Sequence, residues 1–277
     1  MGLSARREVH FARSAVALEY EGKRAAAIID FLFQHIDDTG PARPHVTYRI
    51  DQQATELVLQ RAEVTLYRGV SDAECADILL GDSTHELADR STDGLLFHAA
   101  ALAWQGRGLL LPGRVAAGKT TLSAWLTTCG FDFLSDELIF VPTGSATLQA
   151  LTRPLNVKSS ARSVLRPYFD FDRHAAQLLS TPRGDLIPAE LLRPANKLNA
   201  VTPHAIILPQ YVAGADFKLA PLSSAQAAFA LIDTVVNARN LPDHGLPELA
   251  RLARSIPAYQ LTYNHFAQIG DRLEELM

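Results

Sequence analysis

The spacing of apolar positions predicts alternating helices and strands from the first residues onward. Residues 24–35 place Ile28, Phe31 and Leu32 at helical spacing between polar ends, so a helix that buries this side is expected. Three runs rich in β-branched or aromatic residues then predict an antiparallel meander, over residues 45–50, 56–60 and 63–67.

A helix over residues 71–80 is expected to follow the meander. Ser71 would be its N-cap, with Glu74 at the reciprocal capping position. The first third of the chain carries no recognisable chemistry, and its scattered acids and histidines are typical of a solvated surface. We therefore expect residues 1–92 to form a small α+β N-terminal module and residues 93–277 to form a second domain.

A hairpin of two apolar strands is expected to open the second domain. Residues 95–104 are an apolar run, Gly106 and Gly108 mark a turn, and residues 109–111 are a second buried strand. Because these strands would be antiparallel, the pattern predicts a mixed sheet and an α/β protein. Strands are also expected at residues 131–134, 138–141, 204–209, 217–220 and 258–263, and helices at residues 121–128, 223–237, 246–255 and 266–276. The helix at 223–237 would bury an apolar side that includes Phe229.

The chemistry begins with a complete G-x-x-x-x-G-K-[ST] motif between a predicted strand and a predicted helix. Backbone N–H groups curled around an anion at a helix N-terminus would bind phosphate, and Lys119 would add a full positive charge. The Thr120 hydroxyl is placed to ligate Mg²⁺. The expected nucleotide-binding residues are Gly113, Arg114, Val115, Ala116, Ala117, Gly118, Lys119, Thr120 and Thr121. A nucleoside triphosphate site is therefore the first hypothesis.

An acidic pair, Asp136 and Glu137, follows this motif at the end of the next predicted strand. Carboxylates in that position suit a metal ion and the proton of an attacking hydroxyl. One carboxylate would lie near Mg²⁺ and the other near the nucleophile. The alternative is a pair of surface acids in a turn.

The block from His98 to Glu137 resembles the catalytic core of HPr kinase/phosphorylase and its HPr kinase-like relatives. That family combines a strand beginning with a histidine, a short turn, a strand into the phosphate loop, a helix, and a strand ending in two acids. The corresponding pieces here are Leu96-Phe97-His98, Gly106-Arg107-Gly108, Gly113 to Thr120, Cys129-Gly130-Phe131 and Asp136-Glu137. Phosphoenolpyruvate carboxykinase shares a more remote version of this architecture.

The resemblance implies a mixed-sheet P-loop kinase core of the HPr kinase and phosphoenolpyruvate carboxykinase type, with ATP-dependent transfer to a serine hydroxyl. It makes Asp136 the general base and puts His98 beside the phosphates; Thr120, Asp136 and Glu137 would hold Mg²⁺. Without that resemblance, a lone histidine on an apolar strand is more often a core or surface residue.

Two departures limit the resemblance. The family's Ser-Gly-x-Gly-Lys-Ser is replaced by Val-Ala-Ala-Gly-Lys-Thr at residues 115–120, and the second acid is Glu137 instead of Asp. The reverse dephosphorylation of the bifunctional enzymes is therefore not carried over to this chain.

Two basic residues downstream, Arg153 and Lys158, precede a helix predicted over residues 161–165. A cation there could stabilise the charge on a transferring phosphoryl group, although both residues could equally be ordinary surface positions. Residues 169–199 have weak periodicity, which is typical of a substrate-covering loop and of any irregular connection.

Composition narrows the class of protein. The 277 residues are 48% hydrophobic and 20% charged, as in a globular protein, and no apolar run approaches the roughly 20 residues of a membrane-spanning helix. A net charge of −4 without a long basic tract gives no reason to expect nucleic acid or a membrane as partner. The N-terminus lacks the apolar core of a signal peptide, and Cys75 and Cys129 are expected as buried, reduced thiols. A cytoplasmic location is therefore expected.

Three functions remain open at this point. The favoured hypothesis is an ATP- and Mg²⁺-dependent kinase acting on a serine or threonine hydroxyl of a small protein or peptide. The second is a nucleotide-binding sensor or scaffold that transfers nothing, and the third is a small-molecule kinase on the same core. The resemblance also implies self-association into a homo-oligomer, which no heptad or exposed stripe in the sequence supports.

Overall fold

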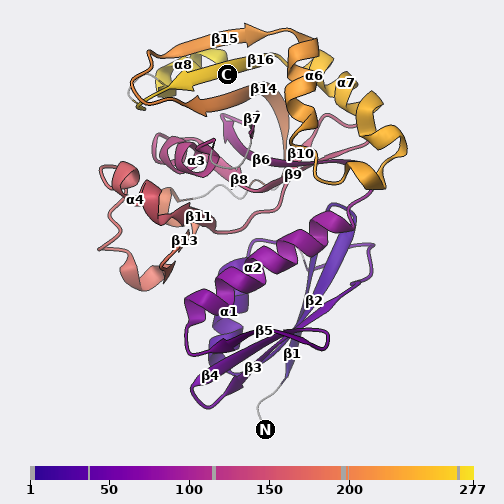
Figure 1. Ribbon diagram of the computed structural model, residues 1–277, viewed down its shortest axis with the longest axis vertical. Coiled ribbons are helices and arrows are strands. Elements are labelled where there is room, and N and C mark those ends of the chain that lie inside the picture. The colour runs from indigo at the N-terminus through magenta and orange to yellow at the C-terminus, as the bar shows by residue number, and fades with distance from the viewer. Residues whose placement is uncertain (1–3, 37, 114–116, 195–197, 199, 267–268) are drawn as a thin grey trace.

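The computed structural model describes residues 4–36, 38–113, 117–194, 198, 200–266 and 269–277. These residues form a mixed α/β structure in which parallel and antiparallel strands build three sheets (Figure 1). Within these ranges, no helix combines the length and the apolar character that crossing a membrane requires.

The N-terminal part contains a five-stranded sheet in the order β1-β2-β3-β4-β5. Its elements are β1 (Ala5–Phe11), β2 (Ser14–Glu21), α1 (Lys23–Phe33), β3 (Thr47–Gln53), β4 (Glu56–Arg61), β5 (Val64–Gly69) and α2 (Asp72–Asp89). The expected meander is confirmed as β3, β4 and β5, which pair antiparallel. Strand β2 pairs parallel with β3 through the α1 crossover, the usual connection for parallel strands.

Helix α1 is confirmed, but its buried side differs from the expected one. Ile28 and Leu32 are buried, whereas Phe31 is half-buried and Ile29 and Phe33 are buried in its place. The buried face is wider than expected because the helix packs on both the sheet and α2.

Helix α2 begins as expected and runs past the expected end. The Ser71 Oγ accepts a hydrogen bond from the Glu74 N–H at 3.2 Å. The Tyr67 hydroxyl, not the Glu74 side chain, accepts the Ser71 N–H at 2.9 Å. The helix continues to Asp89 because Leu87 and its neighbours bury a further turn against the N-terminal core.

An eight-stranded sheet forms the centre of residues 93–277, in the order β10-β9-β6-β7-β14-β16-β15, with β8 also pairing with β6. Its strands are β6 (Gly94–Trp104), β7 (Arg107–Pro112), β8 (Asp132–Ser135), β9 (Leu138–Pro142), β10 (Leu148–Ala150), β14 (Ala200–Tyr211), β15 (Lys218–Leu222) and β16 (Ala258–Tyr263). The expected antiparallel hairpin is confirmed as β6 and β7.

Five strands of this sheet run in the same direction: β7, β8, β9, β14 and β16. Strand β14 pairs parallel with β7 and with β16. Strand β8 is antiparallel to β6, as β7 is, so β8 and β7 also run the same way. The carboxyl ends of β7, β8, β14 and β16 therefore lie along one edge of the sheet.

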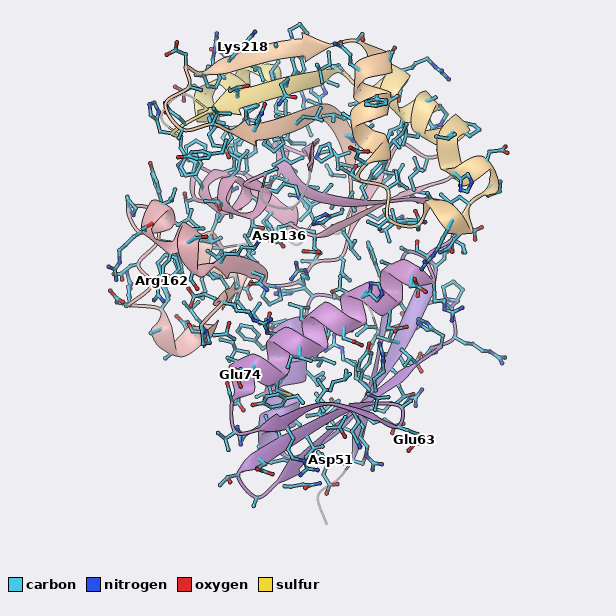
Figure 2. All side chains as sticks on the ribbon, viewed as in Figure 1. Asp51, Glu63, Glu74, Asp136, Arg162 and Lys218 are labelled. Atoms are coloured by element: carbon cyan, nitrogen blue, oxygen red, sulfur yellow. The ribbon has the colours of Figure 1, made fainter. Side chains whose placement is uncertain are left out.

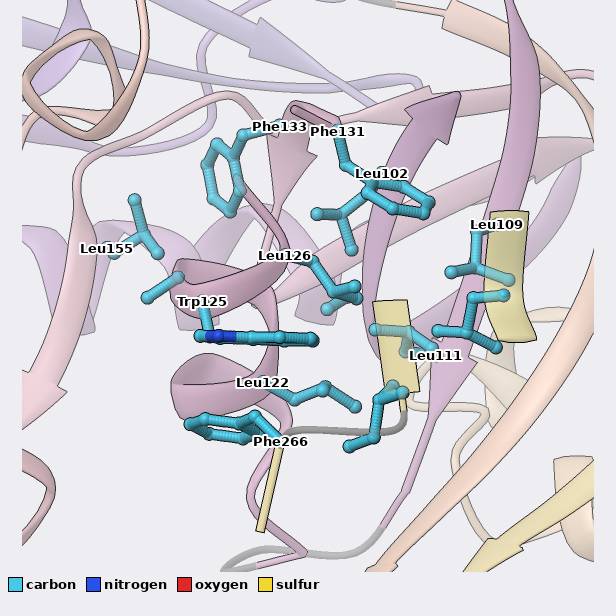
Figure 3. Packing of buried hydrophobic residues seen from close by; sticks show 14 of the residues in the cluster. Leu102, Leu109, Leu111, Leu122, Trp125, Leu126, Phe131, Phe133, Leu155 and Phe266 are labelled. Atoms are coloured by element: carbon cyan, nitrogen blue, oxygen red, sulfur yellow. The ribbon is translucent and has the colours of Figure 1, made fainter. Parts of the chain in front are cut away.

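The period-two pattern of β7 explains the two cores that flank the sheet. Leu109 and Leu111 face helix α3 (Lys119–Thr128), where Leu122 and Trp125 belong to the same apolar cluster (Figure 3). Leu110 faces the opposite side and joins the cluster covered by α6 (Ser224–Ile232) and α7 (Leu246–Ser255). The sheet is thus buried on both faces around its parallel strands β7, β14 and β16, as parallel strands require.

Helix α6 is shorter than expected and buries a different face. Ala227 and Leu231 lie one turn apart against the sheet, and Phe229, half a turn away from both, is 76% exposed. The helix ends at Ile232 because the next residues pair with β6: the His98 N–H donates to the Thr234 carbonyl at 2.8 Å. The expectation of a buried Phe229 was therefore wrong.

The remaining segments complete the fold. Residues 169–199 are not one irregular connection, since they contain two short strands and two short helical elements. A three-stranded sheet has the order β11-β13-β12, from β11 (Leu155–Lys158), β13 (Gly184–Ile187) and β12 (Leu179–Thr181). The other helical elements are α4 (Ser159–Leu165), η1 (Ala175–Gln177), α5 (Ala189–Leu192), η2 (Ala238–Asn240), η3 (Pro242–Gly245) and α8 (Ile269–Leu276).

The apolar core under α1 and α2 extends beyond residue 92. It contains Leu96 of β6, Phe140 of β9 and Leu186 of β13 together with the N-terminal side chains. Of the two cysteines, Cys75 is buried in this core as expected, but Cys129 is exposed at the end of α3.

Candidate functional site

A hollow lined mainly by polar and charged side chains lies where the common carboxyl edge of the sheet faces helix α2. It is a cleft of about 810 Å³ lined by Asp77, His98, Ala117, Gly118, Lys119, Thr120, Thr121, Asp136, Glu137, Asn156, Lys158, Ser160, Ala161 and Arg183. Figure 2 shows Asp136 between the large sheet and α2. The cleft thus brings together residues from both parts of the chain.

The N-terminus of α3 forms one wall of the cleft. Gly118 is its N-cap with a φ of +86°, a backbone conformation that glycine adopts without strain. The Lys119 ammonium is largely buried and donates to the Gly113 carbonyl at 2.7 Å, and burial lowers the pKa of this side chain. Ala117, Thr120 and Thr121 line the same wall, whereas the expected residues Arg114, Val115 and Ala116 lie outside the described residues.

Asp136 is the most buried acid of the cleft. It follows β8 in a turn that Ser135 fixes, since the Ser135 Oγ donates to the Leu151 carbonyl at 2.7 Å. The carboxylate is 2% exposed, and neither oxygen accepts a hydrogen bond of normal geometry from the described residues. Burial raises the pKa of Asp136, and the nearby Arg153 guanidinium only partly offsets this effect.

Arg153 connects the two adjacent acids. Its Nη2 donates to Glu137 Oε2 at 2.6 Å and lies 3.4 Å from Asp136 Oδ1. The Arg153 side chain is itself 5% exposed, so the pair with Asp136 is a buried one. Its position beside both carboxylates orients them toward the same region of the cleft.

His98 lies on β6 on the other side of Glu137. Its Nε2 is 3.7 Å from Glu137 Oε1. Burial lowers the pKa of His98, and the positive charge of Lys119 lowers it further, so the imidazole is mostly neutral at pH 7.

The far wall of the cleft contains residues that no sequence motif indicates. The Asp77 carboxylate on α2 accepts from Asn156 Nδ2 at 3.1 Å and from Arg183 Nη2 at 2.8 Å. Lys158, an expected site residue, lies at the end of β11 on the same wall. No short motif marks Asp77 or Arg183, because only long-range packing of α2 and the β12–β13 turn brings them to the cleft.

The donor set of the cleft suits a hard cation that retains water and phosphate ligands. The Thr120 hydroxyl and the carboxylates of Asp136 and Glu137 supply only oxygen atoms, which Mg²⁺ prefers. Among the described residues, no group of three or more His, Cys, Asp or Glu side chains is arranged to enclose a metal ion. These residues therefore fit a shared metal–phosphate site better than a closed metal centre.

Comparison with known proteins adds little to this geometry. No family model matches the chain, and no curated protein matches it. The solved HPr(Ser) kinase/phosphatase from Coxiella burnetii is similar with a TM-score of 0.32 and 12% identity, over 65% of this chain and 86% of that chain. A TM-score this low transfers neither a fold nor a function.

Proposed function

We propose that this protein is an ATP- and Mg²⁺-dependent kinase that phosphorylates a serine or threonine hydroxyl of a small protein or peptide. The observation that carries the proposal is the Asp136 carboxylate, in one cleft with Lys119 and the N-terminus of α3. It is 2% exposed and lies 3.4 Å from Arg153, and neither of its oxygens accepts a hydrogen bond of normal geometry from the described residues. A buried, unsatisfied polar group costs about 1–3 kcal/mol, so its retention is explained if a ligand completes it.

The phosphates would be held at the N-terminus of α3. Backbone N–H groups there carry a partial positive charge that favours an anion, and Lys119 adds a full charge. Lys158 is a further cation on the facing wall. Thr120 and Glu137 would hold Mg²⁺, which would supply neutralisation of the phosphate charge when bound.

Asp136 would act as the general base. A general base works best when its pKa lies near the working pH, whereas the pKa of an ordinary carboxylate lies well below neutral pH. Burial raises the pKa of Asp136 and so shifts it in the favourable direction. Asp136 would take the proton of the acceptor hydroxyl, so that the hydroxyl oxygen becomes nucleophilic. Arg153 would allow the two adjacent carboxylates to have different roles. Its Nη2 lies 2.6 Å from Glu137 Oε2 but 3.4 Å from Asp136 Oδ1, so it binds Glu137 more tightly than Asp136.

His98 would complete the site as a neutral hydrogen-bonding group. A neutral imidazole can donate a hydrogen bond to a phosphate oxygen without adding a second positive charge beside Lys119. Its position 3.7 Å from Glu137 would keep the ring directed at the cleft.

The test is incubation of the full chain with Mg²⁺ and γ-labelled ATP in the presence of a serine- and threonine-containing peptide library. Label in phosphoserine or phosphothreonine is expected, and Lys119→Met should abolish it. Label in small molecules of a metabolite extract but in no peptide would favour a small-molecule kinase. Tight ATP binding with neither transfer nor hydrolysis would favour a sensor or scaffold, and would contradict the proposal.

A further inference from the structure

The order of the strands along the common carboxyl edge of the sheet shows which strand ends lie on each side of the N-terminus of α3. Along this edge the acid-bearing end of β8 lies on one side of β7, because β8 pairs with β6. The ends of β14 and β16 lie on the other side of β7 (Figure 1). Neighbouring strands are about 4.8 Å apart, so β14 lies one spacing from β7, the strand that leads into Gly113. Their last paired residues are Ile206 and Leu110, and β14 continues past this pair to Tyr211.

Two tyrosines stand at the ends of β14 and β16. Tyr211 and Tyr263 are register partners in the parallel pair, and the Val212 N–H donates to the Tyr263 carbonyl at 2.9 Å. Their rings meet edge to face, with centroids 5.9 Å apart and planes at 73°. Edge-to-face packing against Tyr263 leaves a face of the Tyr211 ring open.

Tyr263 links this aromatic pair to the N-terminus of α3. A Cβ placed on Gly118 would come within 2.9 Å of the Tyr263 Oη, so the phenol lies directly against that glycine. The ring is 3% exposed and stacks on Phe266, which in turn stacks on Trp125 of α3. Burial raises the pKa of Tyr263 to about 12, so the phenol stays neutral.

Tyr211 differs from its partner in being open to solvent. Tyr211 is 57% exposed, although it is a large aromatic residue at the end of a strand whose middle is buried. The cleft itself has no stacking surface of this kind, because no Phe, Tyr or Trp is among its lining residues in the described part of the chain.

We propose that the open face of Tyr211, backed by Tyr263, is where the base of the bound nucleoside triphosphate stacks. This inference rests on the proposed function, which sets the reacting phosphate at Asp136. A triphosphate that extends from Asp136 across the N-terminus of α3 has its nucleoside on the opposite side of β7, where β14 and β16 end. Tyr211 is then a positioning residue for the nucleoside and has no part in the transfer step.

The test compares two ligands that differ only in having a nucleoside. Binding of Mg²⁺–ATP and of Mg²⁺–tripolyphosphate is measured by calorimetry for the wild-type chain, Tyr211→Ala, Tyr211→Phe and the control Tyr168→Ala. Tyr168 is a matched control because it is also an exposed tyrosine, 46%, and packs on the same aromatic cluster, at Trp125 and Phe266.

The expected result is selective for the nucleoside. Tyr211→Ala should weaken ATP about tenfold or more, the scale of base–aromatic stacking, and leave tripolyphosphate within about twofold. Tyr211→Phe, which keeps the ring, and Tyr168→Ala should bind both ligands as the wild type does. Adenine H2 and H8 protons should shift upfield on binding to wild type and Tyr211→Phe, and not on binding to Tyr211→Ala.

Other outcomes overturn the inference in distinguishable ways. If wild type binds ATP and Tyr211→Ala binds it equally well, the stacking site is wrong and the kinase proposal stands. If Tyr211→Ala weakens ATP and tripolyphosphate alike, the ring supports the fold and not the base. If wild type binds neither ligand, the proposed function fails and the stacking site fails with it.

Discussion

At the scale of single residues, Asp136 carries a desolvation penalty that the folded chain offsets only in part. Its carboxylate is buried, and its pKa is raised mainly by that burial. A neighbouring cation, Arg153, is present, but its closest contact is with Glu137. Functional sites are where such penalties are usually retained.

The first prediction is that Asp136→Asn stabilises the metal-free protein at neutral pH. Burial makes the pKa of the Asp136 carboxyl higher in the folded than in the unfolded protein. The contribution of this group to folding stability is therefore fully present at a pH below the unfolded-state pKa. It is lost as the pH rises through the folded pKa. Removing the charge should therefore raise the melting temperature at pH 7, by about 2–4 °C for each kcal/mol relieved, with little change near pH 3. The measurement is thermal unfolding with a chelator, as a function of pH.

Asp185 provides the matched control for this substitution. It is equally buried at 2%, but it accepts from the Ser180 hydroxyl at 2.5 Å and lies 3.6 Å from Arg162. Asp185→Asn should therefore lower the melting temperature at pH 7, since it weakens satisfied interactions. A lower melting temperature for Asp136→Asn as well would contradict the account of Asp136.

At the scale of elements, the edge of β6 depends on one buried amide. The Asn237 Oδ1 accepts the Leu96 N–H at 2.9 Å, and its Nδ2 donates to the Gly94 carbonyl at 2.9 Å. Asn237 is fully buried, so these backbone groups have no access to water. This amide holds the strand that carries His98 against the segment after α6.

The second prediction is that Asn237→Ala lowers the free energy of unfolding by about 2–4 kcal/mol. The substitution leaves a buried N–H and a buried carbonyl unsatisfied, at roughly 1–3 kcal/mol for each group. Asn240→Ala is the control, because the Asn240 amide also donates twice, to Asp89 and Ser91, but is only half-buried. Urea unfolding should show the larger loss for Asn237→Ala, and an equal or smaller loss would refute the prediction.

Elements with a strict period could be predicted from sequence, and those without one could not. Helix α7 and strand β16 have the bounds that their apolar spacing predicts. Strand β1 was missed because its ARREVHF sequence is mostly charged, and β2 because its first five residues are buried without alternation. The three- and four-residue strands between residues 169 and 199 are too short to give a periodic signal.

The same distinction applies to the candidate site. Lys119, Thr120 and Asp136 are close in sequence, so local motifs placed them in one cleft before the fold was known. Asp77 and Arg183 are 106 residues apart, and nothing local in the sequence predicts their hydrogen bond. Tyr263 is buried, but its contact with Gly118 depends on strand pairing far along the chain and has no local signal in the sequence.

At the scale of the whole molecule, the N-terminal sheet and the large sheet share an apolar core. Phe140 of β9 is 1% exposed and meets Phe11 of β1 edge to face, with ring centroids 6.4 Å apart. Leu96 and Leu186 lie in the same cluster as the side chains of α1 and α2. Loss of order on one side would therefore expose apolar surface on the other.

The third prediction is that the chain unfolds in a single calorimetric transition that Phe140→Ala moves as a whole. The substitution should cost about 3–5 kcal/mol, as expected for removing a buried aromatic ring. Phe229→Ala is the matched control, because the same side chain at 76% exposure should change stability by less than about 0.5 kcal/mol. Two separate transitions, only one of them shifted by Phe140→Ala, would contradict a shared core.

The central claim joins two features of the cleft: the N-terminus of α3 binds the triphosphate, and Asp136 after β8 activates the acceptor hydroxyl. The most direct test measures the ATP dissociation constant and the rate of phosphoryl transfer to the peptide library on the same preparations of wild type and Asp136→Asn. We expect Asp136→Asn to bind ATP within about threefold of wild type and to transfer about 10²–10⁴ times more slowly, the usual contribution of a general base. Transfer by Asp136→Asn at the wild-type rate would contradict the claim.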